Sequence, residues 1–193
     1  MITKKNIAIF LSGSGSNARK IIEHFKNHPS VKVALLVSNK PDLGANLISE
    51  EHQIPLLSIT KPMLYDETIF LKSLKDYEID FIVLAGFLLL VPQYLVKQFD
   101  HKVVNIHPAL LPKFGGKGMY GHHVHEAVKA SGEIESGMTI HFCNAQYDEG
   151  DIIFQAKTVI EPSDSPTDIA RKVLVLEHTH YARVIESVLA IGH

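Results

Sequence analysis

The chain has 193 residues and carries 19 Lys and Arg against 21 Asp and Glu, which gives a formal net charge of −2. This balance excludes a broad basic field for nucleic acid or for an acidic membrane surface. A hydrophobic fraction of 46% with 21% charged residues is typical of a globular protein and excludes extensive disorder. The single cysteine, Cys143, excludes an internal disulfide and a cysteine-based zinc site, and it suits a reducing cytosol.

The apolar runs of the chain are short. Residues 7–11 are too few for the core of a signal peptide. The longest run, residues 81–91, contains Gly86 and falls well short of the roughly 20 residues that span a bilayer. We therefore expect a cytoplasmic protein that has neither a nucleic-acid partner nor a membrane partner.

The first hundred residues alternate between short apolar runs and longer amphipathic ones. The short runs predict strands at 6–11, 31–38, 55–58, 81–85 and 102–106. The longer runs predict helices at 17–28, 44–52, 63–77 and 92–98. Nearly all-apolar strands that alternate with helices predict an α/β fold, a Rossmann-like, mostly parallel twisted sheet with helices on both faces. Ligands of such sheets bind at the carboxyl ends of the strands, here after residues 11 and 85 and around residue 105.

The pattern changes after residue 107. The segment "PALLPKFGGKGMYGHH" holds two prolines and four glycines and predicts a long loop, followed by a helix at 123–130. Residues 137–144 and 151–160 alternate in polarity and predict an antiparallel pair, an extension of the sheet. A long closing helix is expected, with Ser165 as its cap and Pro166 at its first position. We interpret residues 1–193 as a single domain, with a mononucleotide-binding-like half over about 1–100 and a second half over about 101–193.

The loop "SGSGSN", residues 12–17, follows the first predicted strand. Gly13 and Gly15 allow the backbone to turn so that several N–H groups point at one anion. Ser16 and Asn17 can cap the helix that follows and donate to oxygen, at the positive end of the helix dipole. The loop therefore predicts a phosphate site, with a plain glycine turn as the alternative.

The same spacing fits the dinucleotide fingerprint, which requires an acidic residue at the end of the second strand. Ser38, Asn39 and Lys40 stand there instead. Lys40 leaves an NADP-binding variant open, whereas the absence of a Gly-Lys-Ser/Thr sequence excludes a Walker loop. A single phosphomonoester is the favoured ligand.

Two polar residues interrupt the apolar fifth strand near its end. The period of two puts Asn105 and His107 on the same face, and Pro108 keeps His107 extended. An imidazole can shuttle a proton near neutrality, and an amide can donate to a developing oxyanion. The pair is therefore a candidate for catalysis, and the alternative is a core histidine with satisfied hydrogen bonds.

A second polar face comes from the segment "GMTIHFCNAQYDEG". Thr139, His141 and Cys143 lie on the same face of the predicted strand. Asp148 lies in the turn that follows, from which its carboxylate could orient a histidine or favour its protonated form. No sequence feature indicates that Cys143 is activated as a thiolate.

A cluster of histidines follows the long loop. His122, His123 and His125 have a spacing that suits one helical face poorly, and no carboxylate or cysteine set completes it. We therefore predict no metal site.

Four segments, in this order and spacing, resemble the phosphoribosylglycinamide formyltransferase family: "FLSGSGSN", "VLAGFLLLVP", "NIHPALLPKF" and "YDEGDIIFQ". The resemblance runs over about residues 5–190. The third segment is specific for the wider formyltransferase superfamily. The first segment narrows the match to the members that act on a ribonucleotide. The family moves a formyl group from 10-formyltetrahydrofolate to the amino group of glycinamide ribonucleotide in de novo purine synthesis. The resemblance implies 10-formyltetrahydrofolate as co-substrate, no tightly bound cofactor, and a catalytic and folate-binding role for the second half.

The resemblance also implies roles for particular residues. Asn105, His107 and Asp148 match the catalytic residues, with Asp148 expected to raise the pKa of His107. Thr139 and Pro108 are expected to support them. The substrate's phosphate and ribose are assigned to Gly13, Gly15, Ser16, Asn17 and Glu177. The folate is assigned to Leu88, Leu89, Leu90, His141, Asn144, Ala145 and Tyr147.

The sequence departs from the family pattern in two places. The segment "GFLLLVP" lacks the arginine that members often carry and is a residue shorter than the commonest form, and "LPKFGGKGMYGHHVH" resembles a longer subgroup. The alternatives are a formyltetrahydrofolate deformylase-like hydrolase, an NADP-dependent oxidoreductase and a non-enzymatic nucleotide-binding module. A methionyl-tRNA formyltransferase would need a further nucleic-acid-binding domain and a positive surface. Both a monomer and a homodimer remain open.

Overall fold

The computed structural model describes residues 4–40, 44–144 and 146–191. Its strands form one seven-stranded sheet in the order β3-β2-β1-β4-β5-β6-β7. The chain divides into two compact units, residues 1–104 and 105–193, and strand β5 (Val103–His107) contains the boundary. The predicted α/β class, mostly parallel with an antiparallel C-terminal pair, is confirmed. The single-domain organisation stays a prediction.

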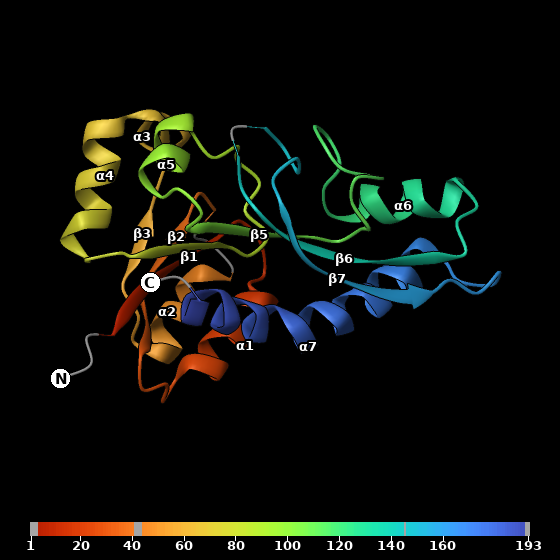
Figure 1. Cartoon of the computed structure of the whole chain (residues 1–193), viewed down its shortest axis with the longest axis horizontal. Coiled ribbons are helices and arrows are strands. Elements are labelled where there is room, and N and C mark those ends of the chain that lie inside the picture. The colour runs from red at the N-terminus through yellow and green to blue at the C-terminus, as the bar shows by residue number, and fades with distance from the viewer. Residues whose placement is uncertain (1–3, 41–43, 145, 192–193) are drawn as a thin grey trace. The chain divides into compact units, whose positions relative to one another are not determined.

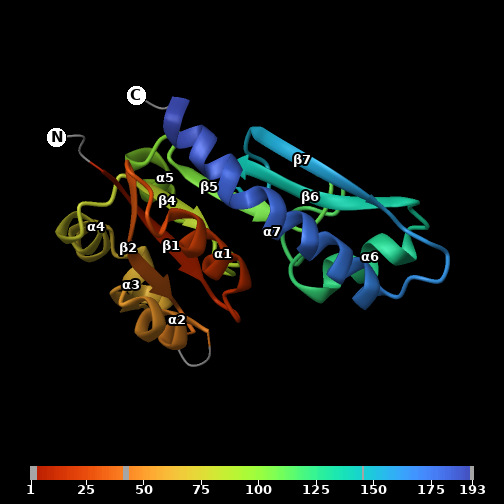
Figure 2. The ribbon, with the colours of Figure 1, turned by 90° about the horizontal axis from the view of Figure 1, so that it is seen from below.

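The first unit is a parallel sheet with helices on both sides. Strand β1 (Lys5–Leu11) pairs with β2 (Val31–Ser38) and β4 (Phe81–Leu84), and β2 pairs with β3 (Leu56–Ser58). Figures 1 and 2 show helices α1 (Ser16–Phe25) and α2 (Ala45–His52) on one side of these strands. Helices α4 (Glu67–Asp76) and α5 (Gln93–Gln98) lie on the other side. The last five residues of β1 are buried, which explains its apolar sequence.

One predicted helix is divided in the structure. Instead of a single helix over 63–77, α3 (Lys61–Tyr65) is followed by α4. The break falls at Asp66, which has an extended backbone conformation and whose Oδ1 accepts from the N–H of Ile69 at 3.0 Å. The prediction was wrong because Asp66 acts as the N-cap of a new helix, which the apolar periodicity alone does not reveal.

The second unit contains an antiparallel pair and two helices. Strand β6 (Glu135–Phe142) pairs with β7 (Ile152–Val159), as predicted. Helix α7 (Pro166–Ile191) runs along both strands and also contacts α6 (His122–Ala130), which Figure 2 shows. The predicted cap of α7 is confirmed, because the N–H of Asp168 donates to Ser165 Oγ at 3.2 Å and the N–H of Ser165 donates back to Asp168 Oδ2 at 3.0 Å.

Within the described residues, the structure contains no helix with the length and apolar character needed to span a bilayer.

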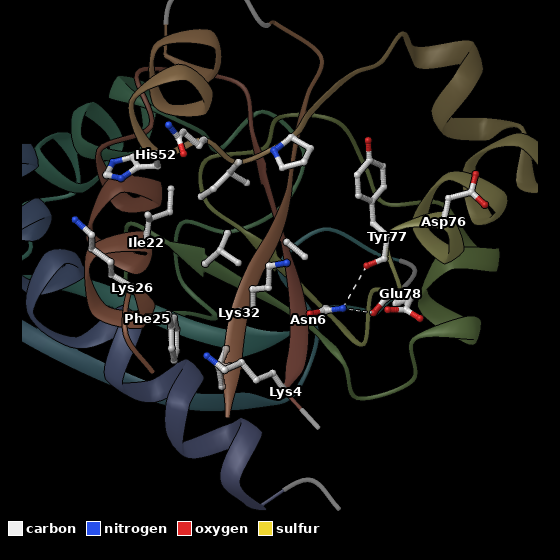
Figure 3. Close-up of a pocket in the computed structure, with 16 residues that line it drawn as sticks. Lys4, Asn6, Ile22, Phe25, Lys26, Lys32, His52, Asp76, Tyr77 and Glu78 are labelled. Carbon is white, nitrogen blue, oxygen red and sulfur yellow. Dashed lines mark hydrogen bonds between the residues drawn. The ribbon is translucent and has the colours of Figure 1, made fainter. Parts of the chain in front are cut away.

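A cavity of about 450 Å³ opens in the first unit at the N-terminal ends of β1 and β2 (Figure 3). Asn6 lies on its wall and donates from Nδ2 to the carbonyl oxygens of Tyr77 and Glu78, at 3.4 and 3.2 Å. The glycine loop lies beyond the opposite end of β1, about 20 Å away at the usual rise of a strand. This cavity is therefore separate from the carboxyl-end site that the sequence predicts.

Candidate active site

The glycine loop is shaped by close packing at Gly15. This residue is the N-cap of α1 and has a φ of 75°, in the left-handed region that side chains rarely adopt. A Cβ there would clash with Cδ1 of Ile48 and lie 3.0 Å from Cδ1 of Leu11. The prediction that Ser16 and Asn17 cap this helix is wrong, because Gly15 holds the N-cap position and no side-chain cap forms. The start of α1 is left with backbone N–H groups available to an anion.

Asn105, His107 and Asp148 lie together in the second unit, with His141 beside them. Asn105 and His107 come from β5, His141 from β6, and Asp148 from the turn that follows β6. Asn105 Nδ2 is 3.2 Å from His141 Nε2 and 3.5 Å from Asp148 Oδ1. Asp148 Oδ2 is 3.4 Å from His107 Nδ1, and Asp148 Oδ1 is 3.6 Å from His141 Nε2. The structure thus gathers the three residues predicted to be catalytic around one carboxylate.

Backbone carbonyls determine where the protons lie on the two rings. The Phe142 carbonyl oxygen is 2.8 Å from His141 Nδ1, and the Phe114 carbonyl oxygen is 2.8 Å from His107 Nε2. Because a carbonyl only accepts, both of these nitrogens carry protons. Nε2 of His141 faces both the Asn105 amide, at 3.2 Å, and the Asp148 carboxylate, at 3.6 Å. His107 is left with Nδ1 facing the carboxylate of Asp148.

Burial and charge act in opposite directions on His107. Burial lowers the pKa of this imidazole, although the charge of Asp148 and the Phe114 carbonyl both raise it. The expected upward effect of Asp148 is confirmed, but the net pKa is lowered, because the side chain is only 4% exposed and its desolvation outweighs both attractions. The neutral form of the ring is favoured more than the motif alone suggests.

Asp148 keeps its charge in this buried setting. Burial raises its pKa, but a hydrogen bond from His141, the charge of His107 and the N–H of Gly116 together hold the pKa of Asp148 below its usual value. The Gly116 N–H donates to Oδ2 at 3.0 Å. Asp148 is therefore an anion at neutral pH.

The loop before α6 supplies contacts that the sequence analysis missed. Phe114 gives its carbonyl to His107 and Gly116 gives its N–H to Asp148. A Cβ on Gly115 would lie 2.5 Å from Leu111 Cδ2 and 3.3 Å from Asp148 Cβ. The double glycine of "LPKFGGKG" was the available signal, since adjacent glycines permit a close approach of the backbone.

Thr139 supports the segment that follows His107. It is completely buried, and its Oγ1 donates to the Ala109 carbonyl at 2.7 Å and accepts from the Leu111 N–H at 3.0 Å. Gln155 Nε2 donates to the same Oγ1 at 2.9 Å and to the Leu111 carbonyl at 2.9 Å. Gln155 was missed, and its only signal was a polar residue at an alternating position of β7.

The residues assigned to folate lie in both units. In the first unit, Leu88 is 41% exposed and Leu89 is half-buried. The Leu90 carbonyl accepts a hydrogen bond from the Tyr65 hydroxyl at 3.1 Å. In the second, Asn144 Oδ1 accepts from the Gln146 N–H at 2.9 Å. Tyr147 there is partly exposed, and Ala145 lies outside the described residues.

The remaining candidates are in the second unit. Glu177 is 8% exposed on α7, and Pro108 is half-buried directly after His107. Burial raises the pKa of the Cys143 thiol far above its usual value, so this sulfur is a poor nucleophile.

Two residues of the histidine cluster contact Glu126, and the third is buried apart from them. His122 Nε2 is 3.6 Å from Glu126 Oε1, His123 Nδ1 is 3.1 Å from Glu126 Oε2, and His125 is buried. Over residues 4–40, 44–144 and 146–191, no three His, Cys, Asp or Glu side chains are grouped to hold a metal ion.

Residues 5–185 match the sequence model of the family described as Formyl transferase. The chain belongs to the formyl transferase family. It is 41% identical over 191 residues to the chloroplastic phosphoribosylglycinamide formyltransferase of Arabidopsis thaliana, and the match covers 96% of this chain but 65% of that protein. It is 31% identical to the phosphoribosylglycinamide formyltransferase of Bacillus subtilis, over 98% of this chain and 97% of that protein.

A solved structure is similar to this formyl transferase over almost its whole length. The crystal structure of phosphoribosylglycinamide formyltransferase from Bacillus halodurans has a TM-score of 0.87 and 34% identity, and it covers 98% of this chain and 97% of that one. The resemblance that the four motifs predict is therefore confirmed. The matched range also contains every candidate site residue, from Gly13 to Glu177.

Proposed function

We propose that this formyl transferase moves the formyl group of 10-formyltetrahydrofolate to the amino group of glycinamide ribonucleotide in purine biosynthesis. The products are N-formylglycinamide ribonucleotide and tetrahydrofolate. The names of the relatives from A. thaliana and B. subtilis support this reaction, as does that of the B. halodurans structure. The observation that carries the proposal is the cluster in which one ionised carboxylate, Asp148, contacts Asn105, His107 and His141.

The proposed reaction requires an oxyanion to be stabilised and a proton to be moved. The amine attacks the formyl carbon, a new C–N bond forms, and the bond from that carbon to N10 of the folate breaks. One proton passes from the amine to N10. Asn105 and protonated His107 stabilise the oxygen of the tetrahedral intermediate, where negative charge develops. Asp148 stabilises the imidazolium of His107 and orients a water that carries the proton.

Substrate recognition in this proposal uses backbone groups at several loops. The phosphate binds the N–H groups of Gly15, Ser16 and Asn17, at the left-handed turn where α1 begins. Gly13 gives the loop room, because no atom lies within 4 Å of a Cβ built there. Buried Glu177 accepts from the ribose hydroxyls.

The folate binds at two segments in this proposal. Its pterin ring contacts the backbone of residues 88–90 and the loop that contains Asn144, Ala145 and Tyr147, with His141 beside it. Thr139 and Pro108 hold His107 in position. No tightly bound cofactor is required, because the folate enters and leaves as a co-substrate.

The proposal also covers partners and location. Both substrates are small molecules, and the net charge of −2 offers no field for nucleic acid or an anionic membrane. We propose a monomer or homodimer that works in the cytoplasm, although the A. thaliana relative is named as chloroplastic.

The proposed function is tested with the purified protein, glycinamide ribonucleotide and 10-formyltetrahydrofolate. We expect loss of the formyl donor only when glycinamide ribonucleotide is present, with N-formylglycinamide ribonucleotide as product. Donor loss without the ribonucleotide would indicate a deformylase instead. Tight NADPH binding without formyl transfer would indicate the oxidoreductase.

A further inference from the structure

Ser12 lies directly after β1 and joins the segments that follow three strands. It is 6% exposed. Its backbone N–H donates to the Gly86 carbonyl at 3.1 Å, and its Oγ accepts from the Leu88 N–H at 3.0 Å. The same hydroxyl donates to Oδ1 of Asn39 at 2.5 Å. One serine therefore connects the loop after β1 with the segments after β2 and β4.

The chemistry of the groups gives each bond its direction. The N–H of Leu88 can only donate, so the hydroxyl oxygen of Ser12 is the acceptor there. The hydroxyl hydrogen is then available to the amide oxygen of Asn39. Ser12 uses its donor and its acceptor at the same time, and alanine at this position would remove both bonds.

The segment 88–90 is held at both ends. Ser12 holds the N–H of Leu88, and the Tyr65 hydroxyl holds the Leu90 carbonyl at 3.1 Å. Of these two supports, Ser12 also begins the phosphate loop, residues 12–17. A change in the conformation of that loop is therefore transmitted to the backbone of residue 88 through one side chain.

The geometry points to Ser12 as a positioning residue that couples the binding of glycinamide ribonucleotide to the binding of folate. This inference rests on the proposed function, which assigns the phosphate to residues 13–17 and the pterin to residues 88–90. Phosphate binding fixes the loop, and Ser12 passes that restraint to the N–H of Leu88. By linkage, folate has the same effect on phosphate affinity. Each ligand raises the affinity for the other by at least about fivefold.

Titration calorimetry measures this coupling without turnover. Tetrahydrofolate carries no formyl group, so it forms a non-reactive ternary complex with glycinamide ribonucleotide. We compare the dissociation constant of the ribonucleotide without and with saturating tetrahydrofolate. The ratio is at least about 5 for the wild-type protein and falls to about 1 for Ser12→Ala. A merely structural role would weaken both affinities and leave the ratio unchanged.

Two further variants make the test specific. Ser38→Ala is the matched control, because Ser38 is 1% exposed at the end of the adjacent strand β2 and its Oγ accepts from the Lys40 N–H at 3.1 Å, within its own segment. This control keeps the wild-type ratio. Asn39→Ala removes the acceptor of the Ser12 hydroxyl and keeps the bond to Leu88, so its ratio falls between those of wild type and Ser12→Ala. It replaces Ser12→Ala in the test if that variant does not fold.

The outcomes separate this inference from the proposed function. A wild-type ratio of about 1, or an unchanged ratio in the folded serine or asparagine variant, overturns the coupling, and formyl transfer by the wild-type protein would still support the reaction. A wild-type protein that binds neither ligand and transfers no formyl group overturns the proposed function itself.

Discussion

Oδ2 of Asp148 lies 3.4 Å from Nδ1 of His107, and the other nitrogen of that ring lies 2.8 Å from the carbonyl oxygen of Phe114. Both ring nitrogens therefore face oxygen acceptors, an arrangement that a doubly protonated ring satisfies. Burial opposes the second proton by lowering the pKa of His107. A ring that is oriented for two protons but desolvated against the charge holds its second proton weakly.

We predict that Asp148→Asn retains the fold and loses about 10²–10⁴-fold in kcat, the usual contribution of acid–base groups. The asparagine keeps the shape of the side chain but removes the charge that stabilises the imidazolium of His107. Folding should persist because residue 148 has a φ of 55°, and asparagine tolerates this left-handed region well. Steady-state kinetics and circular dichroism measure the two effects.

Asp151→Asn is the control for this change. Asp151 lies just after the same turn, is exposed, and contributes its backbone carbonyl to the Phe142 N–H at 2.9 Å. Its neutralisation should leave kcat unchanged. Near-normal turnover of the Asp148 variant would remove Asp148 from the catalytic set.

The second prediction concerns the amide of Asn105. Asn105→Ala should lower kcat by about 10²–10³-fold, as the loss of one oxyanion donor does in other enzymes. The variant should fold, because Asn105 is only half-buried. Its KM values should change little if the amide acts mainly in the transition state. Exposed Asn27 provides the control, since Asn27→Ala should change neither constant. A variant at 105 with wild-type kcat would contradict the role.

The third prediction contrasts two glycines of the phosphate loop. Gly15→Ala should lower the free energy of unfolding by about 1–3 kcal/mol, because the φ of 75° is strained for alanine and its Cβ clashes with Ile48. Gly13→Ala should change this free energy by less than about 0.5 kcal/mol, because no atom lies within 4 Å of the new Cβ. Urea denaturation compares the two. Equal losses would show that Gly15 is not specifically constrained.

The sheet was well predicted because the burial of its strands is directly visible in the amino-acid sequence. Strands covered on both faces are continuous apolar runs, and the bounds of β2 are exactly those predicted, residues 31–38. The break at Asp66 was harder to predict from the sequence. Its position depends on a single side chain, which caps a new helix instead of continuing the preceding one. Local chemistry of this kind is not visible in a hydrophobic pattern.

The candidate site was predictable only where side chains supply its groups. Asn105, His107 and Asp148 stand in recognisable motifs, but the Phe114 carbonyl and the Gly116 N–H are backbone groups that any sequence could provide. The pKa of His107 was predictable only in part, since Asp148 raises it as expected but the net shift is downward. Its direction depends on how deeply the ring is buried, and that follows from packing around the whole loop rather than from Asp148 alone.

The last prediction concerns the acid sensitivity that His125 confers. His125 is 6% exposed, and burial, with the charges of His122 and His107, lowers its pKa from 6.5 to about 4. Its Nδ1 has no hydrogen-bond partner among the residues that the structure describes. The folded protein therefore holds this ring neutral at a pH where the unfolded chain would protonate it.

The sign of the pH dependence follows from this difference. Above pH 6.5 the ring of His125 is neutral in both states and contributes no slope. As the pH falls from 6.5 toward 4, His125 becomes protonated in the unfolded chain but stays neutral in the folded protein. The free energy of unfolding therefore decreases. The total loss is on the order of 2–3 kcal/mol. The lowered pKa of Asp148 acts in a separate window, below its ordinary value of 3.8.

His125→Gln should remove much of this slope while His107, whose pKa is also lowered, retains part of it. We would measure urea unfolding at about pH 7 and about pH 4.5, where the wild-type protein should lose on the order of 2 kcal/mol more than the variant. His123→Gln is the control, because His123 is exposed and pairs with Glu126 at 3.1 Å. It should behave as the wild type does. Identical losses in the wild-type protein and His125→Gln would mean that His125 titrates alike in the folded and unfolded states, and that the acid sensitivity has another source.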